Sequence, residues 1–238
     1  MNTLNSTLKP KINGNTTNYN EFLRILGDNH AATSKSTPLR KDAFEVDDET
    51  KIGKIALYFE EIMNTLGLDL TDDSLQGTPL RVAKMYVQEI FSGLNPANKP
   101  DYTLFENKFQ YNQMLVEKDI KVHSYCEHHF VPIIGKAHIA YISNGQVIGL
   151  SKINRIVEYF SKRPQVQERL TEQIADDLKK VLKTENVAIL IEAEHMCVAM
   201  RGVKDYGSST TTSSYYGKFL ETDTRNEFLK YVYAGKTN

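Results

Sequence analysis

The stretch IIGKAHIAYISNGQVIGLSKINRIVEYFSKR, residues 133–163, places a strand, a turn, a second strand and a helix in direct succession. β-Branched and aromatic residues dominate 133–142 and recur in 146–150, and the Ser-Asn-Gly between them is typical of a turn. Ser151 then opens an amphipathic helix, which ends at Pro164 because proline cannot continue it. Two strands followed by a helix predict the centre of an α+β domain.

The segments on either side extend this pattern. A strand is predicted at 121–125, and apolar residues at helical spacing predict a second helix over 166–181. A β-prone run predicts a further strand over 187–200, whereas the Ser/Thr-rich segment 208–214 has the composition of a flexible linker. A short strand follows, and then a final helix from Asp223 or Thr224 to about Tyr233. Strands, a helix pair and further strands together predict an α+β fold.

Two helices are predicted before the strands. Apolar residues recur at helical spacing from Ile52 to Leu66, and Gly67 is a suitable stop for that helix. Thr78 is the predicted N-cap of the second helix, with Pro79 in its first turn. One apolar face then continues until Gly93.

The first 45 residues have a different composition from the rest. They are rich in Asn, Thr, Ser and Lys, and their apolar patch is Phe22–Leu26. Such a segment buries too little surface to offset the entropy lost on ordering, so residues 1–45 are predicted to be a disordered tail. The folded domain is then 46–238, with helices over 46–95 and the core over 110–238.

Composition and charge exclude several classes of protein. The chain has 29 Lys and Arg against 30 Asp and Glu, so no overall field attracts nucleic acid or an anionic membrane. It has no run of about 18 apolar residues, and its first residues lack the apolar centre of a secretory signal. The chain's 2 cysteines argue for reduced thiols rather than a disulfide framework. These features predict a cytoplasmic protein.

Each cysteine lies beside a histidine at a spacing that suits a metal ion. Cys126 and His129 enclose two residues in C-E-H-H, and His195 and Cys197 enclose one in H-M-C. A lone cysteine is as often a small buried side chain, but two Cys/His pairs favour a metal site. Cys126, His129 and Cys197 would leave an open coordination position, which is the catalytic pattern for zinc. His128 and His195 would then be free to contact water or substrate.

A second group of residues has the chemistry of an anion site. Ser151 begins a helix directly after a strand, with Lys152 in the first turn and Arg155 nearby. Free N–H groups and the positive end of the helix dipole attract anions there. An ordinary serine cap with two solvated bases is the alternative, and the residues alone leave it open. Lys84, on the helix that starts at Thr78, is open to the same two interpretations.

Two further charged residues are candidates. If the strand over 187–200 continues regularly, Arg201 lies on the same face as His195 and Cys197, because alternate residues share a face. Glu168, next to Gln167, lies in the first turn of a predicted helix, where a carboxylate is favourable in itself. That is the commoner explanation, and the functional alternative is that Glu168 accepts two parallel hydrogen bonds from a planar donor pair such as that of guanine.

Several of these segments resemble the motifs of the GTP cyclohydrolase I family. They are T-P-x-R-V-A-K-M at 78–85, C-E-H-H-F at 126–130, V-I-G-L-S-K-I-N-R-I-V at 147–157, R-P-Q-V-Q-E-R-L-T at 163–171 and the His-x-Cys of His195 and Cys197. The resemblance covers about residues 50–235 and leaves the tail outside.

The resemblance implies a role for each position already singled out. The implied zinc ligands are Cys126, His129 and Cys197, and the implied catalytic residues are His128 and His195. The implied substrate-binding residues are Glu168 with Gln167 for guanine, and Lys84, Ser151, Lys152, Arg155 and Arg201 for the triphosphate. The resemblance also implies that 208–214 belongs to the folded core rather than to a linker.

The resemblance implies a fold, an assembly and a reaction as well. The fold is the tunnelling fold, an α+β subunit with an antiparallel sheet, helices packed on one side of it and helices at the N-terminus. The subunits pool their sheets into a barrel and form a homodecamer with each active site at a subunit junction. The reaction is zinc-dependent hydrolysis of GTP at C8, giving 7,8-dihydroneopterin triphosphate and formate, the first step of tetrahydrofolate and pterin biosynthesis.

Two alternative functions are open, and the second belongs to a different functional class. The first is another tunnelling-fold enzyme that acts on a pterin or deazapurine, but a nitrile reductase would need its own nucleophilic cysteine, and the metal already uses both. The second is a zinc-stabilised protein that binds a nucleotide without turning it over. The spare histidines beside an open coordination position argue against such a binding module.

Overall fold

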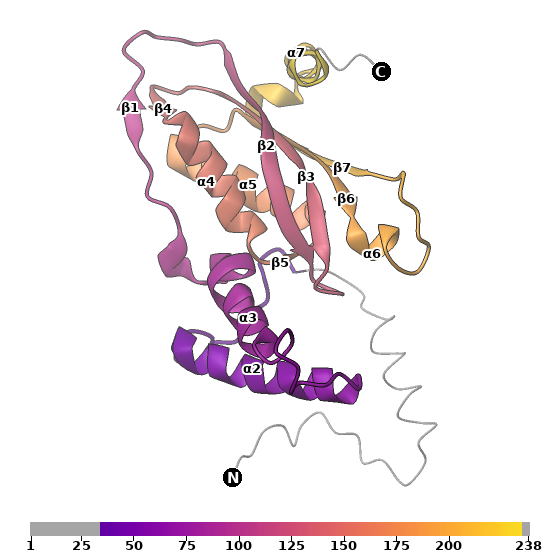
Figure 1. Cartoon of the computed structure of the whole chain (residues 1–238). Helices are drawn as coiled ribbons and strands as arrows, with labels where there is room; N and C mark the ends of the chain where they lie inside the picture. The colour runs from indigo at the N-terminus through magenta and orange to yellow at the C-terminus, as the bar shows by residue number, and fades with distance from the viewer. Residues whose placement is uncertain (1–33, 235–238) are drawn as a thin grey trace, which may run out of the picture. The chain divides into compact units, whose positions relative to one another are not determined.

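A five-stranded sheet is the centre of the fold (Figure 1). The computed structural model describes residues 34–234, and the fold below is that of the unit from Ser36 onward. In sheet order the strands are β5 (Pro164–Gln165), β2 (Met114–Cys126), β3 (Pro132–Ile142), β6 (Val187–His195) and β7 (Thr210–Tyr215). The pairs from β2 to β7 are antiparallel, whereas β5 runs parallel to the end of β2. The predicted antiparallel sheet is therefore mixed at one edge.

A helix pair covers one face of this sheet, as Figure 1 shows. It consists of α4 (Leu150–Ser161) and α5 (Gln167–Leu182), which contact each other and the strands β2 and β6. The main core lies between these layers and includes Ile153, Ile156, Leu170, Ile174, Val122, Ile139 and Ile189. This arrangement confirms the predicted α+β fold, in which amphipathic helices bury their apolar faces against a sheet.

The C-terminal helix α7 (Thr222–Tyr233) packs against the opposite face. Phe228 and Val232 of α7 are buried with Ala140 and Ile142 of β3, whereas Ile139 belongs to the main core. Successive strand residues point to opposite faces, so the two clusters lie on the two sides of the sheet. Helices α4 and α5 thus cover one side of the sheet, as predicted, and α7 adds a helix on the other side.

The helices at the start of the domain agree with the periodicity of the sequence. Helix α2 spans Asp48–Thr65, where the Asp47 side chain accepts a hydrogen bond from the Thr50 N–H, and Gly67 follows it with φ of 80°. Helix α3 spans Thr78–Lys84 and continues as a π-helical turn, Met85–Ile90. Two 3₁₀ turns, Ser92–Leu94 and Pro96–Asn98, complete this part.

The predicted starts of α3 and α4 are wrong by one residue. The N-cap of α3 is Gly77 rather than Thr78, and α4 begins at Leu150 with Gly149 as its N-cap rather than at Ser151. Neither cap makes a side-chain hydrogen bond, so the serine and threonine signals in the sequence marked the first turns and not the caps.

The predicted strand bounds are wrong where strand length depends on pairing with a neighbouring strand. Strand β2 begins at Met114 rather than at Lys121, because its first residues pair with the end of β3. A short pair of β1 (Leu104–Glu106) and β4 (Gln146–Ile148) includes one strand that was not predicted. The segment 208–214 contributes most of β7, so the linker interpretation from composition is wrong.

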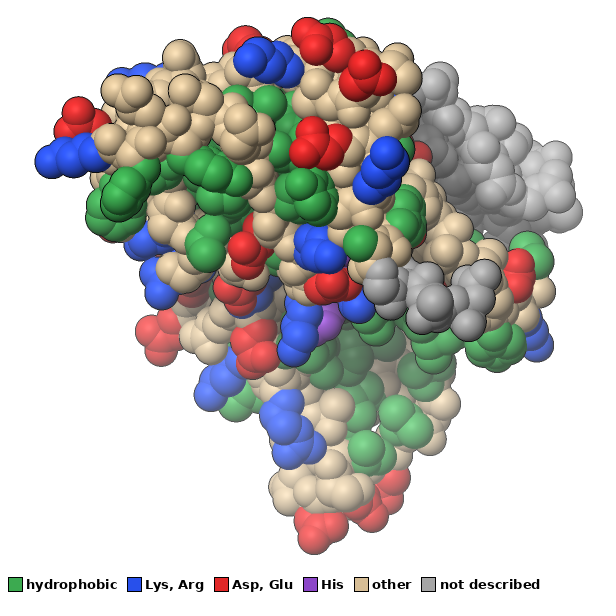
Figure 2. Space-filling view, turned by 90° about the horizontal axis from the view of Figure 1, so that it is seen from above, with side chains coloured by type: hydrophobic (Ala, Val, Ile, Leu, Met, Phe, Trp, Pro, Cys, Tyr) green, Lys and Arg blue, Asp and Glu red, His purple; other side chains and the backbone are tan. Residues whose placement is uncertain are grey.

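The predicted tail and the surface charge can be compared with the structure only in part. Residues 1–33 of the predicted tail lie outside the described residues, and from residue 34 to α2 the chain has turns and bends. Among the described helices, none combines the length and apolarity needed to cross a membrane. On the face shown in Figure 2, Lys and Arg side chains alternate with Asp and Glu, in agreement with the net charge of -1.

A glycine in β3 gives the first testable prediction. A Cβ at Gly135 would lie 2.1 Å from the Glu192 carbonyl oxygen and 2.5 Å from the Ala193 Cβ, so β6 would have to move. We expect Gly135→Ala to destabilise the fold by about 3 kcal/mol and to lower Tm by roughly 5–10 °C.

The matched control is Gly53 in α2, where a Cβ would have nothing within 4 Å. Gly53→Ala is expected to raise stability by about 0.5–1 kcal/mol, because alanine loses less entropy than glycine in a helix. Both variants are compared by thermal unfolding, and a Gly135→Ala protein as stable as the unaltered one would contradict the close packing of β3 on β6.

Candidate metal centre and active site

Three side chains from distant parts of the chain form a candidate metal group. Cys126 ends β2, His129 lies in the turn that follows, and Cys197 lies in the short helix α6 (Met196–Ala199). Their ligand atoms all lie within 4.8 Å of one another. Two sulfur ligands and one imidazole at this separation suit a transition ion such as zinc, and leave a coordination position open. The predicted ligand set is therefore brought together by the fold.

A tight turn presents the first two ligands. The N–H groups of His129 and Phe130 both donate to the Cys126 carbonyl, at 3.3 and 2.8 Å, and the Cys126 N–H donates to the Val131 carbonyl. Phe130 has φ of 54°, which reverses the chain within the turn. The backbone thus folds around Cys126 and directs its thiol and the His129 imidazole to the same space.

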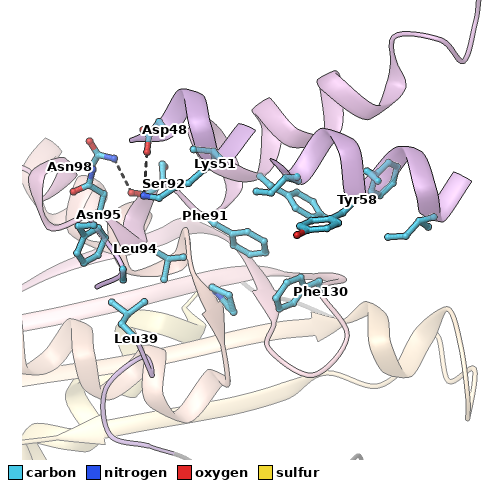
Figure 3. Close-up of a pocket in the computed structure, with 18 residues that line it drawn as sticks. Leu39, Asp48, Lys51, Tyr58, Phe91, Ser92, Leu94, Asn95, Asn98 and Phe130 are labelled. Atoms are coloured by element: carbon cyan, nitrogen blue, oxygen red, sulfur yellow. Dashed lines mark hydrogen bonds and ion pairs between the residues drawn. The ribbon is translucent and has the colours of Figure 1, made fainter. Parts of the chain in front are cut away.

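Aromatic side chains pack this turn against the N-terminal helical part. The Phe130 ring lies 5.1 Å from the ring of Phe91 and 6.5 Å from that of Tyr86. Figure 3 shows Phe91 and Phe130 close together in an apolar pocket of about 450 Å³, which is also lined by residues of α2. The metal-binding turn therefore packs against the helical part of the domain.

Cys197 reaches the group by a different route from the one that strand periodicity predicts. The strand was expected to run to Met200, but β6 ends at His195 and the chain turns into α6. The last pair of the ladder joins His195 to Ile133, and β3 begins one residue before Ile133, at Pro132. Beyond His195 the strand has almost no partner, so its backbone groups are satisfied in a helical turn instead.

Arg201 lies beside the metal group although it is not on a strand. Its Nη1 atom is 2.8 Å from Nε2 of His129. Burial, followed by the charge of Arg201, lowers the pKa of His129, which favours the neutral imidazole that binds metals. Burial and the neighbouring Cys126 raise the pKa of the Cys197 thiol, so metal binding must displace a proton there.

His195 is held by a buried glutamine. The Oε1 atom of Gln167 lies 2.7 Å from His195 Nε2. The Gln167 Nε2 group donates to the carbonyls of Ile191 and Thr210, at 3.0 and 2.9 Å, and also contacts the Thr212 hydroxyl. Because this amide bonds β6 and β7 at the same time, its side chain is fixed and orients the imidazole.

The electrostatic surroundings of His195 include Glu168. Burial lowers the pKa of His195, and the charge of Glu168 offsets part of that effect. Glu168 is exposed in the first turn of α5, so its carboxylate is available to a ligand near this histidine. His128 is exposed as well, and its Nδ1 atom lies 3.7 Å from the Cys126 sulfur. Of the predicted catalytic histidines, His128 therefore contacts Cys126, and His195 ends β6 two residues before Cys197.

Four predicted triphosphate residues lie on other elements of the fold. Ser151, Lys152 and Arg155 are in the first turns of α4, and Lys84 ends α3. Within residues 34–234, no hydrogen bond or ion pair joins these four side chains to the metal group. Arg155 instead lines a small pocket with Gly93, Asn98 and Lys162.

Two residues of the site were not predicted from the sequence. Arg169 of α5 forms a bidentate ion pair with Glu127, with N–O distances of 2.6 and 3.2 Å, and Glu127 lies between Cys126 and His128. The two are 42 positions apart. A glutamate inside C-E-H-H was the available signal, but no sequence pattern names its partner.

Comparisons with known proteins give a consistent result. The sequence profile of the GTP cyclohydrolase I family matches residues 55–233. The chain is 59% identical over 215 residues to the "GTP cyclohydrolase 1" of Flavobacterium johnsoniae, which covers 90% of this chain and 96% of that protein. Proteins of the same name from Escherichia coli and Shigella boydii are each 55% identical over 202 residues, or 84% of this chain and 91% of theirs.

Proposed function

The chain belongs to the GTP cyclohydrolase I family, and from this membership we propose which of its residues carry out the reaction and how subunits share the active site. The enzyme converts GTP to 7,8-dihydroneopterin triphosphate with release of formate, the first step of tetrahydrofolate and pterin biosynthesis. The observation that supports the assignment most directly is the group of Cys126, His129 and Cys197, which lies beside two histidines.

The donor set fits zinc, since two thiolates and one imidazole are common zinc ligands. When bound, zinc is a Lewis acid that lowers the pKa of water from about 15.7 towards about 7. Cys126, His129 and Cys197 would hold the ion. Their thiols must be reduced, which is in keeping with the cytoplasm.

The two histidines would handle protons. His195, oriented by Gln167, would donate a proton to N7 of the guanine ring when the bond at C8 is hydrolysed. Burial lowers the pKa of His195, and the charge of Glu168 offsets part of that effect, which favours the protonated form that this step needs. His128, which is exposed next to Cys126, would orient the attacking water and move protons in the later ring-opening and ribose steps.

Binding of GTP would use the carboxylate and the cations. Glu168 would accept two hydrogen bonds from the N–H groups of the guanine edge, and Gln167 beside it would keep His195 in place for the same ring. Lys84, Ser151, Lys152, Arg155 and Arg201 would bind the triphosphate. A chain with a net charge of -1 cannot attract this anion as a whole, so a local group of cations is needed.

The sheet has two edges that a second copy could extend. Strand β7 is one edge of the sheet, and β5 pairs only with Tyr125 and Cys126 of β2, so most of β2 is the other. Open edges expose backbone groups that pair readily with another strand. We propose that copies join through these edges into a barrel, within a homodecamer, as in the tunnelling fold.

This assembly would explain why Ser151, Lys152 and Arg155, unlike Arg201, are not joined to the metal group in one subunit. In our proposal, Ser151, Lys152 and Arg155 of one copy face the metal group of a neighbouring copy, and each active site lies at a junction. The catalytic domain would be residues 46–238, which contain the whole family match, 55–233.

Mixing two inactive variants tests the shared site. We expect Lys152→Ala/Arg155→Ala and His195→Ala to be inactive at low GTP concentration when each is assembled alone. Oligomers formed by coexpression of the two should regain about a quarter of the unaltered turnover, because each site then draws one intact residue set from each copy by chance. Formate release is measured after isolation of mixed oligomers through two different tags. Mixed oligomers without any recovered activity would show that each site lies within one subunit.

A further inference from the structure

We propose that Glu127 and Arg169 are positioning residues. They hold the metal-binding turn against the first turns of α5 and so fix the position of Cys126 and His129 relative to Cys197. The inference rests on the proposed function insofar as Cys126, His129 and Cys197 bind zinc. It gives a role to a buried ion pair whose two residues are neither proposed metal ligands nor proposed substrate-binding residues.

The geometry of the pair is that of a strong interaction. Arg169 Nη1 and Nη2 donate to the two carboxylate oxygens of Glu127, at 2.6 and 3.2 Å. The side chains are 3% and 19% exposed, so the fork-to-fork contact is shielded from solvent and from salt. Removing one member would leave a buried charge without this partner, and the turn would have to shift to hydrate it.

The position of Arg169 on α5 links this pair to the other half of the site. Gln167, two residues earlier, bonds His195 and the Ile191 carbonyl of β6, the strand that leads to Cys197. The start of one helix therefore contacts both sides of the metal group, the turn with Cys126 through Arg169 and the end of β6 through Gln167. Glu168 lies between them and is exposed, in keeping with a carboxylate that meets substrate.

Backbone pairing joins the turn to the α5 side of the site through few contacts. Strands β5 and β2 share two register pairs, Tyr125 with Pro164 and Cys126 with Gln165. The Glu127 N–H adds one hydrogen bond to the Gln165 carbonyl, at 2.9 Å. The Glu127 carboxylate extends this short ladder to α5, so the ion pair sets the distance between Cys126 and the helix that orients His195.

The test compares metal affinity in Glu127→Gln and in the unaltered enzyme. Glutamine keeps the shape of the side chain but removes its charge. We expect the Kd for Zn²⁺, measured by competition with a chromophoric chelator, to rise by about 10–100-fold. The absorption spectrum of the Co²⁺-loaded protein should change, because the ligand geometry changes. At saturating metal, kcat should fall while the KM for GTP stays within about threefold.

A second ion pair on α5 provides the matched control. Asp177, whose side chain is 7% exposed, pairs with Lys99 and with the Tyr102 hydroxyl, away from the metal group. Asp177→Asn should lower Tm and leave the Kd for Zn²⁺ and the Co²⁺ spectrum unchanged. Arg169→Lys, which keeps the charge but loses the fork, is the second variant in case Glu127→Gln fails to fold, and it should also weaken Zn²⁺ binding.

Two results would overturn the proposal. One is a Kd for Zn²⁺ within twofold of the unaltered value in a folded Glu127→Gln or Arg169→Lys protein. The other is equal weakening of Zn²⁺ binding by Asp177→Asn, which would reduce the pair to general stability. Metal binding is read without GTP, so an unaltered enzyme that binds Zn²⁺ but releases no formate would contradict the proposed function alone.

Discussion

Cys197→Ser is expected to abolish formate release from GTP, with a loss of at least about a thousand-fold, or about 4 kcal/mol of transition-state stabilisation. A serine hydroxyl is a poor zinc ligand at neutral pH, and the remaining pair of Cys126 and His129 cannot complete the site. Without the metal, water keeps a pKa of about 15.7 and supplies almost no nucleophile at neutral pH. Treating the unaltered enzyme with a strong chelator should have the same result.

The measurement combines zinc content with product formation. Formate and the fluorescence of oxidised neopterin are followed from the same GTP incubation, with and without added Zn²⁺. Val198→Ser is the matched control, because Val198 lies on the same helical turn and is 38% exposed. It should retain zinc and turnover. Full formate release from a zinc-free Cys197→Ser protein would refute the role of the metal group.

His195→Asn is expected to lower kcat by about 10²–10⁴-fold, the usual contribution of a positioned general acid. Asparagine can still contact Gln167, so the fold and the metal group should be preserved. Its amide, however, is too weak an acid to donate a proton to N7. The KM for GTP should change little, because the guanine edge and the triphosphate are bound by other residues. The variant is therefore expected to bind GTP and zinc without turning GTP over.

Three measurements on His195→Asn test this expectation: kcat and KM from formate release, zinc content, and Tm. His138→Asn is the matched control, since it removes a fully buried imidazole from the neighbouring strand β3. That variant should change Tm and leave kcat nearly as it is. If His195→Asn retained normal turnover, the proton at N7 would have to come from another group.

The sequence was most informative where the pattern is local. The apolar spacing of α2, α4 and α5 predicted these helices to within a few residues, because a helix that packs on a sheet needs one apolar face whatever lies opposite. The metal ligands were predicted for a similar reason. Thiolate and imidazole are chemically distinctive, and each pair is close along the chain.

The end of β6 could not be predicted from such patterns. The sequence of 187–200 predicts one continuous strand, but β3 begins at Pro132 and supplies almost no partner beyond His195. Strand length depends on the neighbouring strand, which is a property of the sheet. Arg201 consequently reaches His129 from the chain beyond α6 rather than from a strand face.

The amino-acid sequence by itself determined the family, the α+β class and the residues that can bind zinc, because these follow from local periodicity and from the chemistry of single side chains. Beyond the metal ligands, the tertiary structure alone decided which side chains meet. Gln167 contacts His195 across 28 positions, and Arg169 contacts Glu127 across 42. Such pairs form only when α5 docks on the sheet, so their geometry is set by packing that no one-dimensional pattern contains.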